Sequence, residues 1–205
     1  DVVSNMQNTF FPMLRLSPAN DDLSQFTPSM IPGIEPVPGE PQDDKGIALL
    51  LPSFTGLLER GRMGTNNVYP DRGGIVRQYP VYRDHFGWRV PSLPAKVGEV
   101  LGWKNPMEPE VYLNWRGKFG AFRSVRFSDV FEDFLRRDRQ RATDEFTNKI
   151  VIIGSTASAL FDSKPTPMEK IHPGVEILAT AIGNIKNGDW ITQAKNPWLF
   201  TALAL

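Results

Sequence analysis

The chain has 205 residues and a formal net charge of zero, with 23 basic and 23 acidic side chains. This length suits one domain or two small ones, and a neutral chain has no overall field that would attract nucleic acid or an anionic membrane surface. The chain has no cysteine and only 2 histidines, which excludes disulfides, cysteine-ligated zinc, iron–sulfur clusters and a thiol nucleophile.

The N-terminal quarter of the chain predicts a strand, a long surface excursion and a helix. Residues 10–16 are mostly apolar and predict a buried strand. Prolines are dense over 17–46, which forbids helix and central strand there. From 47 to 58 apolar residues recur at helical spacing. Because proline favours the start of a helix, we expect this helix to begin near Pro52 and to end at Gly61.

The next part of the chain predicts a turn, a hairpin and a second helix. Residues 70–74 combine proline, aspartate and two glycines, the composition of a tight turn. The roughly alternating run 75–82 and the short run 88–90 predict an antiparallel hairpin. A helix is then expected over 92–102, opened by serine and closed by glycine.

The C-terminal half determines the predicted fold class. Residues 149–153 form a β-branched run typical of a strand buried on both faces. Helices are predicted on either side of it, over 128–141 with Ser128 as N-cap and over 173–187. With a further strand at 111–115, this alternation predicts an α/β fold: a layered, mostly parallel sheet flanked by helices, with the antiparallel hairpin added.

The last residues leave two interpretations open. After Lys195 the chain is apolar and uncharged as far as Leu205. A membrane-spanning helix needs about 20 such residues, so this run suits either the first turns of a membrane helix or a short tail packed on the core. The first residues, from Asp1, show no signal-peptide pattern, and we expect the chain to start within a domain.

The loop 154–167, after the predicted central strand, is the first place to look for a ligand. It has one glycine and no Gly-Lys-Ser/Thr, which disfavours a phosphate loop, and the chain has no Gly-x-Ser-x-Gly elbow. His172 stands directly before Pro-Gly and is interpreted as a helix-entry residue rather than a base. We therefore predict no catalytic residue, no metal and no cofactor. The candidate ligand-binding or switch residues are Ser155, Thr156, Asp162, Thr166 and Glu176.

Three motifs occur in order along the chain. Pro70–Arg77 contains Asp-x-x-Gly-x-x-Arg, Val111–Gly117 reads Val-Tyr-Leu-Asn-Trp-Arg-Gly, and Lys149–Ile177 begins Lys-Ile-Val-Ile-Ile-Gly-Ser-Thr and ends His-Pro-Gly-Val-Glu-Ile. Together they resemble the type-2 CHASE family of extracytoplasmic sensory domains. The motif residues to which we assign structural roles are Asp71, Gly74, Arg77, Asn114, Gly154, Pro167 and Gly174. The chain departs from the family pattern at 178–180, where Leu-Ala-Thr replaces His-Ala-Asn.

The resemblance implies a sensory domain of a bacterial receptor, on the periplasmic side of the inner membrane. It implies relay through membrane helices to a cytoplasmic nucleotide cyclase or kinase, none of whose catalytic parts lies in this chain. We expect 1–192 to be one sensor domain without its N-terminal part, and 193–205 to be a linker and the start of a membrane helix. The expected partners are a small-molecule or protein signal, the membrane and a second copy, but not nucleic acid. The alternative is a small-molecule hydrolase or a nucleotide-binding α/β enzyme.

Overall fold

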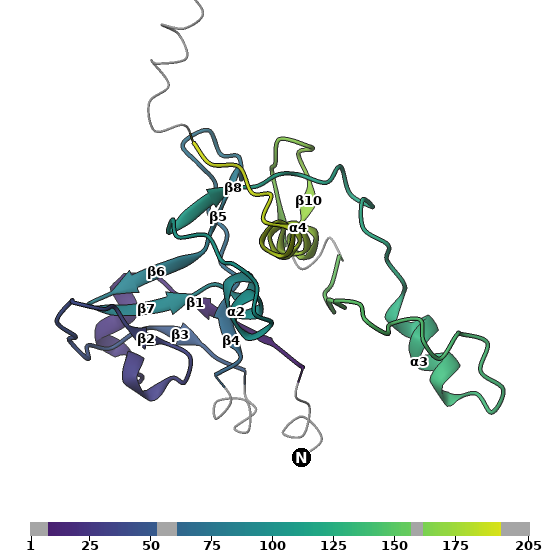
Figure 1. The fold of residues 1–205 in the computed structure, drawn as a ribbon, viewed down its shortest axis with the longest axis horizontal. Helices are drawn as coiled ribbons and strands as arrows, with labels where there is room; N and C mark the ends of the chain where they lie inside the picture. The colour runs from purple at the N-terminus through teal and green to yellow at the C-terminus, as the bar shows by residue number, and fades with distance from the viewer. Residues whose placement is uncertain (1–7, 53–60, 157–161, 194–205) are drawn as a thin grey trace, which may run out of the picture.

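The structure, a computed structural model, describes residues 8–52, 61–156 and 162–193, which form a mixed α/β fold of several small sheets (Figure 1). Its strands are β1 (Phe11–Arg15), β2 (Glu35–Pro36), β3 (Leu49–Leu50), β4 (Met63–Thr65), β5 (Gln78–Pro80), β6 (Tyr82–His85), β7 (Trp88–Pro91), β8 (Glu110–Tyr112), β9 (Ser163–Lys164) and β10 (His172–Pro173). Its helices are α2 (Leu93–Val100), α3 (Phe127–Leu135) and α4 (Gly174–Asn187), with 3₁₀ turns η2 (Pro18–Leu23) and η3 (Pro28–Met30).

The described strands pair mostly in antiparallel fashion. The sheets have the orders β3-β1-β4, β2-β7-β6, β5-β8 and β10-β9, and among the described strands only β1 and β4 pair in parallel. The mixed α/β class is therefore confirmed, but the described strands do not form the layered, mostly parallel sheet that was predicted.

Helices α2 and α4 match their predictions, whereas the hairpin is displaced along the chain. Of the run 75–82, Gln78–Pro80 form β5, which pairs with β8, and only Tyr82 belongs to the hairpin strand β6. The hairpin β6–β7 turns at Phe86 and Gly87, whose φ angles of 47° and 82° are both positive, as its two-residue turn requires. Helix α2 begins after Ser92, whose hydroxyl accepts the amide of Ala95. Helix α4 ends at Gly188, which takes the left-handed conformation that glycine adopts without strain.

The proline-rich excursion 17–46 contributes to the core, although it was predicted to run over the surface. Its Ile31 and Ile34 are buried with Met13 of β1 and Met63 of β4. Proline density did limit regular structure: apart from two 3₁₀ turns, the excursion holds only the two-residue strand β2, which pairs with β7 at an edge of its sheet.

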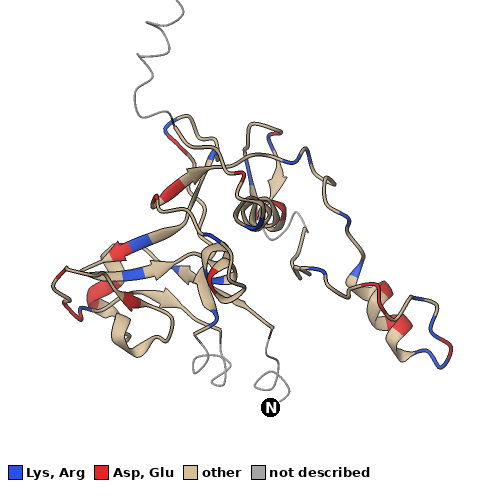
Figure 2. Cartoon of the chain, viewed as in Figure 1, with Lys and Arg blue, Asp and Glu red and all other residues tan. Residues whose placement is uncertain are grey.

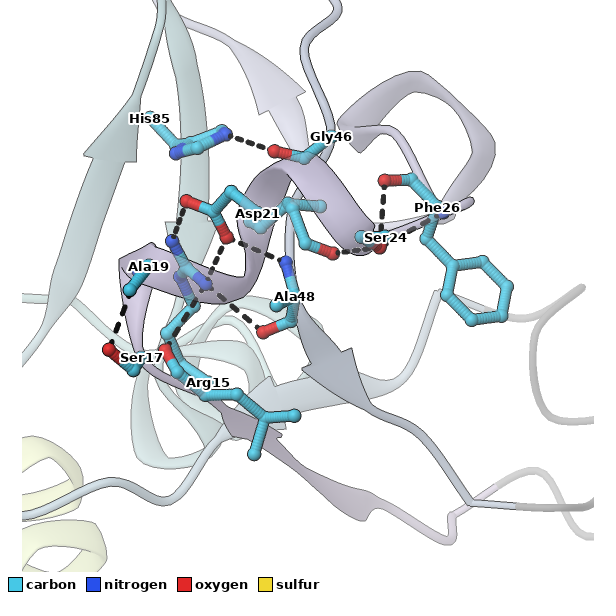
Figure 3. Close-up of polar contacts among 11 residues, drawn as sticks. Arg15, Ser17, Ala19, Asp21, Ser24, Phe26, Gly46, Ala48 and His85 are labelled. Carbon is cyan, nitrogen blue, oxygen red and sulfur yellow. Dashed lines mark hydrogen bonds and ion pairs between the residues drawn. The ribbon is translucent and has the colours of Figure 1, made fainter.

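An ion pair anchors this excursion to β1. Figure 3 shows the carboxylate of Asp21 between the Arg15 guanidinium and the Ala48 amide. The Arg15 nitrogens lie 2.7 and 2.6 Å from the two Asp21 oxygens, and the Ala48 amide donates at 2.8 Å. Burial alone would raise the pKa of Asp21, but the hydrogen bonds from Arg15 and Ala48 together lower it below its ordinary value of 3.8.

The run 149–153 is the largest departure from prediction. It is not a strand, and no described residue forms a strand ladder with it. Ile150 and Val151 are exposed, and Ile153 is exposed to 80%. A β-branched run becomes a doubly buried strand only when neighbouring strands flank it, and the described chain places none there.

The helix expected over 128–141 is shorter and begins earlier. Helix α3 is preceded by Arg126, so Ser128 lies inside the helix and is not its N-cap. The helix ends at Leu135 because the chain then folds back: the Asp133 carboxylate accepts the amides of Gln140 and Arg141 at 2.7 and 3.2 Å.

Three predicted features fall on residues outside the described ranges. They are the body of the helix expected to begin near Pro52, the middle of the loop 154–167, and the apolar run after Lys195. At the start of the run 47–58, Leu49 and Leu50 form strand β3 rather than helix. No helix among the described residues is long and apolar enough to cross a membrane.

The first prediction tests the anchor of the excursion. Asp21→Asn leaves the half-buried Arg15 guanidinium without its charge partner, so we expect a loss of about 1.5–3 kcal/mol at pH 7 in thermal or urea unfolding. Because the pKa of Asp21 is lowered on folding, its stabilisation is present above about pH 4 and is lost as the pH falls through its folded pKa. The wild-type and variant melting temperatures should therefore converge in acid.

The matched control is Asp43→Asn, which removes the exposed ion pair with Lys45. Exposed pairs contribute about 0–1 kcal/mol, so this variant should melt close to wild type. Equal melting temperatures for Asp21→Asn and Asp43→Asn at pH 7 would contradict the anchoring role.

Candidate functional site

The two described ends of the loop 154–167 meet at the first turn of α4. A Cβ on Gly154 would lie 2.6 Å from Val175 Cγ2, and a Cβ on Gly174 would lie 2.4 Å from Asp162 Oδ1. The Gly174 amide donates to the Asp162 carbonyl at 2.7 Å. Only glycine allows these two approaches, so the loop and the helix start are packed as one unit.

The exit of the loop is held by a tight turn. Buried Thr166 accepts the amides of Met168 and Glu169 through its hydroxyl, both at 3.3 Å. The Pro165 carbonyl accepts the Val76 amide at 2.8 Å, which ties the loop to the segment before β5. Thr166 therefore has a local structural role that its hydroxyl already satisfies.

His172 is buried between two glutamates. Its Nδ1 lies 2.7 Å from Glu169 Oε1, and its Nε2 lies 3.9 Å from Glu176 Oε2. The approach to Glu169 lacks the direction of a hydrogen bond, since His172 Nδ1 has no hydrogen-bond partner. The Trp115 ring meets the imidazole edge-on at 5.4 Å. A protonated imidazole here would face two carboxylates at once.

The same two glutamates also bind the backbone of another segment. Glu169 Oε1 accepts the Phe119 amide at 2.7 Å, and Glu176 Oε1 accepts the Gly120 amide at 2.9 Å. The residues around 119–120 are thus connected to the start of α4 by the carboxylates that flank His172. Their attachment depends on where those carboxylates point.

Tyr79 lies beside the same helix. Its ring packs with Ile177 and Ala181 of α4, and its hydroxyl is buried without a hydrogen-bond partner. Burial and the Asp162 carboxylate both raise the pKa of Tyr79 above its usual value. The phenol therefore stays protonated as an unused hydrogen-bond donor.

Unpaired buried polar atoms concentrate around this part of the molecule. In the part of the chain that the structure describes, six buried side-chain atoms lack a hydrogen-bond partner, and three of them are Tyr79 Oη, His172 Nδ1 and Glu176 Oε2. Buried polar groups are normally hydrogen-bonded, so each exception asks for an explanation. We call Tyr79, Asp162, Glu169, His172 and Glu176 the α4 cluster.

The opposite, C-terminal end of α4 is held to the rest of the chain by hydrogen bonds and an ion pair. Buried Asn184 accepts the Asn114 amide at 2.9 Å and donates to the Asn114 carbonyl at 3.0 Å. Arg116 pairs with Asp189 at 2.7 Å, and Ile191 pairs with Tyr112 in an isolated bridge. Asn114 therefore contacts the C-terminal end of α4, from which the chain continues toward its C-terminus.

The predicted site residues separate into three groups. Asp162 and Glu176 belong to the α4 cluster, Thr166 belongs to the exit turn, and Ser155 and Thr156 are exposed. Sequence reasoning missed Tyr79 and Glu169 and interpreted His172 only as a helix-entry residue. The spacing of Glu169, His172 and Glu176, three and then four residues, was the available signal for an acidic setting of the histidine.

The described ranges contain no competing candidate site, either as a metal-binding group or as a deep cavity. No group of three acidic or histidine side chains among these residues could hold a metal ion. A shallow groove beside β3 is lined by Leu16, Leu23, Phe26 and their neighbours, without a titratable side chain. The α4 cluster is therefore the stronger candidate, because polar groups converge there.

The turn 70–74 has the predicted contacts. Asp71 Oδ1 accepts the amides of Gly73 and Ile75 at 2.8 and 3.2 Å, and Asp71 Oδ2 pairs with Arg77. The Ile75 amide and the Arg77 guanidinium lower the pKa of Asp71. Gly74 has a φ of 75°, which a left-handed turn position requires.

That Asp71 serves the turn rather than a ligand stays a prediction. Asp71→Ala removes both backbone bonds and leaves Arg77 unpaired, so we expect a lower melting temperature with unchanged output of the full-length protein. Asp43→Ala is the control, because the exposed Asp43 carboxylate pairs with Lys45 and does not cap a turn. An unchanged melting temperature together with lost output would assign Asp71 a ligand role instead.

A further prediction concerns the unused phenol. Tyr79→Phe removes a buried hydroxyl that has no partner, so we expect equal or higher stability in urea unfolding. Tyr82→Phe is the matched control, since its hydroxyl donates to the Met107 carbonyl at 2.9 Å and its loss should cost stability. A larger loss for Tyr79→Phe than for Tyr82→Phe would mean that the Tyr79 hydroxyl has a structural partner.

Comparisons with known proteins identify the family. The family model described as the CHASE2 domain matches residues 7–205. No curated protein and no solved structure matches the chain. The match extends over nearly the whole chain and confirms the resemblance carried by the three motifs. The chain belongs to the CHASE2 family of non-catalytic, extracytoplasmic sensory domains.

Proposed function

We propose that this CHASE2 domain is the signal-input part of a bacterial transmembrane receptor and that its input site is the α4 cluster. The observation that carries the proposal is the gathering of Tyr79 Oη, His172 Nδ1 and Glu176 Oε2, buried and without a hydrogen bond, beside one helix end. Such groups cost free energy in the resting state. A second arrangement of the loop or a bound signal that supplies partners would recover that free energy.

The two ends of α4 suggest how a signal passes. At the first turn, Gly154 and Asp162 lie in close contact with the helix, so a displacement of the loop would also displace the start of α4. At the last turn, Asn184 and Asp189 connect the helix to Asn114 and Arg116 and to the residues that lead toward the C-terminus. A bias between two arrangements at the first turn therefore has a continuous covalent route along the helix.

The proposal extends to the rest of the receptor. We place residues 1–192 in the sensor domain, on the periplasmic side of the inner membrane, and 193–205 in a linker and the start of a membrane helix. The effector beyond it would be a nucleotide cyclase or a protein kinase. A small molecule or a protein would supply the signal, with Ser155 and Thr156 as additional exposed contacts. The alternative of a hydrolase or nucleotide-binding enzyme has no support from a non-catalytic family.

The test needs no knowledge of the signal. In the full-length receptor, Gly174→Ala places a methyl group against the Asp162 carboxylate and forces the loop away from α4. We expect altered basal output of the effector and faster hydrogen exchange over 162–176. Gly183→Ala is the control on the same helix, because its Cβ meets only Arg116 Nε at 4.0 Å.

The proposal fails under a clear outcome. If Gly174→Ala increases exchange over 162–176 while effector output stays at the level of wild type and Gly183→Ala, then the loop and α4 do not lie on the signalling route. An equal change of output in both variants would point to general helix stability rather than to the α4 cluster.

A further inference from the structure

His172 faces more acceptors than a neutral imidazole can satisfy. Its side chain is exposed to only 1%, with Nδ1 2.7 Å from Glu169 Oε1 and Nε2 3.9 Å from Glu176 Oε2. A neutral imidazole carries one N–H, so it can donate to one carboxylate and turns a lone pair toward the other. A protonated imidazole carries an N–H on both nitrogens. The protonated form therefore has the donors that this setting lacks.

The elements around His172 bring further charged and titratable groups. Strand β9 places Lys164 opposite His172 in the ladder with β10, and the Asp162 carboxylate lies against the start of α4. Tyr79 keeps its proton, because burial and Asp162 raise the pKa of the phenol. The Trp115 ring that meets the imidazole is uncharged. Figure 2 shows acidic residues on α4 and in the loop before β10. Of these side-chain types, only histidine ordinarily changes charge between about pH 5 and 8.

The two glutamates connect His172 to a surface segment. Glu169 Oε1, the oxygen nearest the imidazole, also accepts the Phe119 amide at 2.7 Å. Glu176 accepts the Gly120 amide with Oε1 at 2.9 Å, whereas its Oε2 faces His172 and has no hydrogen bond. Phe119 and Gly120 are themselves exposed. A movement of either carboxylate toward the imidazole is therefore passed to the backbone at 119–120.

We propose that the α4 cluster is a pH-sensing input and that its ligand is the proton, which His172 takes up from solvent. Protonation supplies the missing N–H, so that both glutamates receive a charge-assisted hydrogen bond. The distance of 3.9 Å to Glu176 Oε2 is longer than a hydrogen bond, so Glu176 moves closer by about 1 Å and displaces Gly120 with it. The cluster is closed in acid and open near neutral pH.

This inference rests on the proposed function, because it names the signal that the α4 cluster receives. An extracytoplasmic domain meets the pH of its surroundings. The Glu169 side chain is exposed to 24%, so the pair that it forms with His172 is within reach of solvent protons.

The first experiment follows the imidazoles of the purified chain by NMR between about pH 5 and 8. The chain has only 2 histidines, so His85→Gln leaves the signals of His172 alone. We expect these signals to titrate, and the amides of Phe119 and Gly120 to shift with the same midpoint. His85→Gln should keep this transition, because His85 contacts the Gly46 carbonyl, outside the α4 cluster (Figure 3). His172→Gln should abolish it.

A second variant separates the charge from the backbone bond. Glu176→Gln keeps an oxygen that can accept the Gly120 amide but removes the carboxylate charge beside His172. The midpoint should fall by about 1 pH unit or more, since an opposite charge within about 4–6 Å favours the protonated form. Glu132→Gln, exposed on α3, is the control and should leave the midpoint unchanged. Absence of His172 titration in this pH range would overturn the inference, as would a midpoint that Glu176→Gln does not move.

The last experiment uses the full-length receptor reconstituted in vesicles, with the pH varied on the sensor side and held constant on the effector side. We expect effector output to change several-fold with the sensor-side pH, in the wild type and in His85→Gln but not in His172→Gln. Output that responds to Gly174→Ala but not to this pH would overturn the pH inference and leave the proposed function intact. Output that responds to neither would overturn both.

Discussion

The arrangement of the C-terminal half depends on one buried amide contact, the two hydrogen bonds between the Asn184 side chain and the Asn114 backbone. Asn184 is fully buried, and a buried amide that loses its partners costs far more than such a bond contributes when it is made. The contact therefore has only one acceptable geometry. It fixes the end of α4 against the continuation of β8, and α2 then packs along the helix so positioned.

The two ends of α4 differ in how well their polar groups are satisfied. Near Asn184 the donors and acceptors find partners within the chain, and Arg116 and Asp189 close the same region with an ion pair. Near Gly174 the helix meets a buried histidine between two carboxylates and a phenol without a partner. Apolar side chains of similar volume at these positions would give a fold of equal or greater stability. Their presence at one end is what the proposed input site explains.

Elements whose causes lie close together in sequence were predictable. The hairpin at Phe86–Gly87, helix α2 after Ser92 and the Asp71 turn each depend on a cap or a turn residue within a few positions. The run 149–153 was not predictable, because the burial of a strand depends on neighbours that the run does not contain. The end of α3 was missed for a similar reason: Asp133 stops the helix by binding amides seven and eight residues later.

The α4 cluster shows the same limit at the level of the site. Glu176 was selected because it opens a helix, yet its partners are His172 and the amide of Gly120, 56 residues away. Tyr79 appeared only as one residue of a strand, and its unpaired hydroxyl depends on packing against α4. Local patterns can nominate a helix end, whereas the groups that surround it come from tertiary structure.

The pinned end of α4 also determines what kind of motion the helix transmits. Its 14 residues span about 20 Å at about 1.5 Å per residue. With Asn184 as pivot, the Gly174 end lies about 15 Å away, so a tilt of about 5° displaces it by roughly 1.3 Å. The helix therefore acts as a lever with its fulcrum near the C-terminal end: ångström-scale changes at the first turn become small changes of angle, not of position, in the residues beyond Gly188.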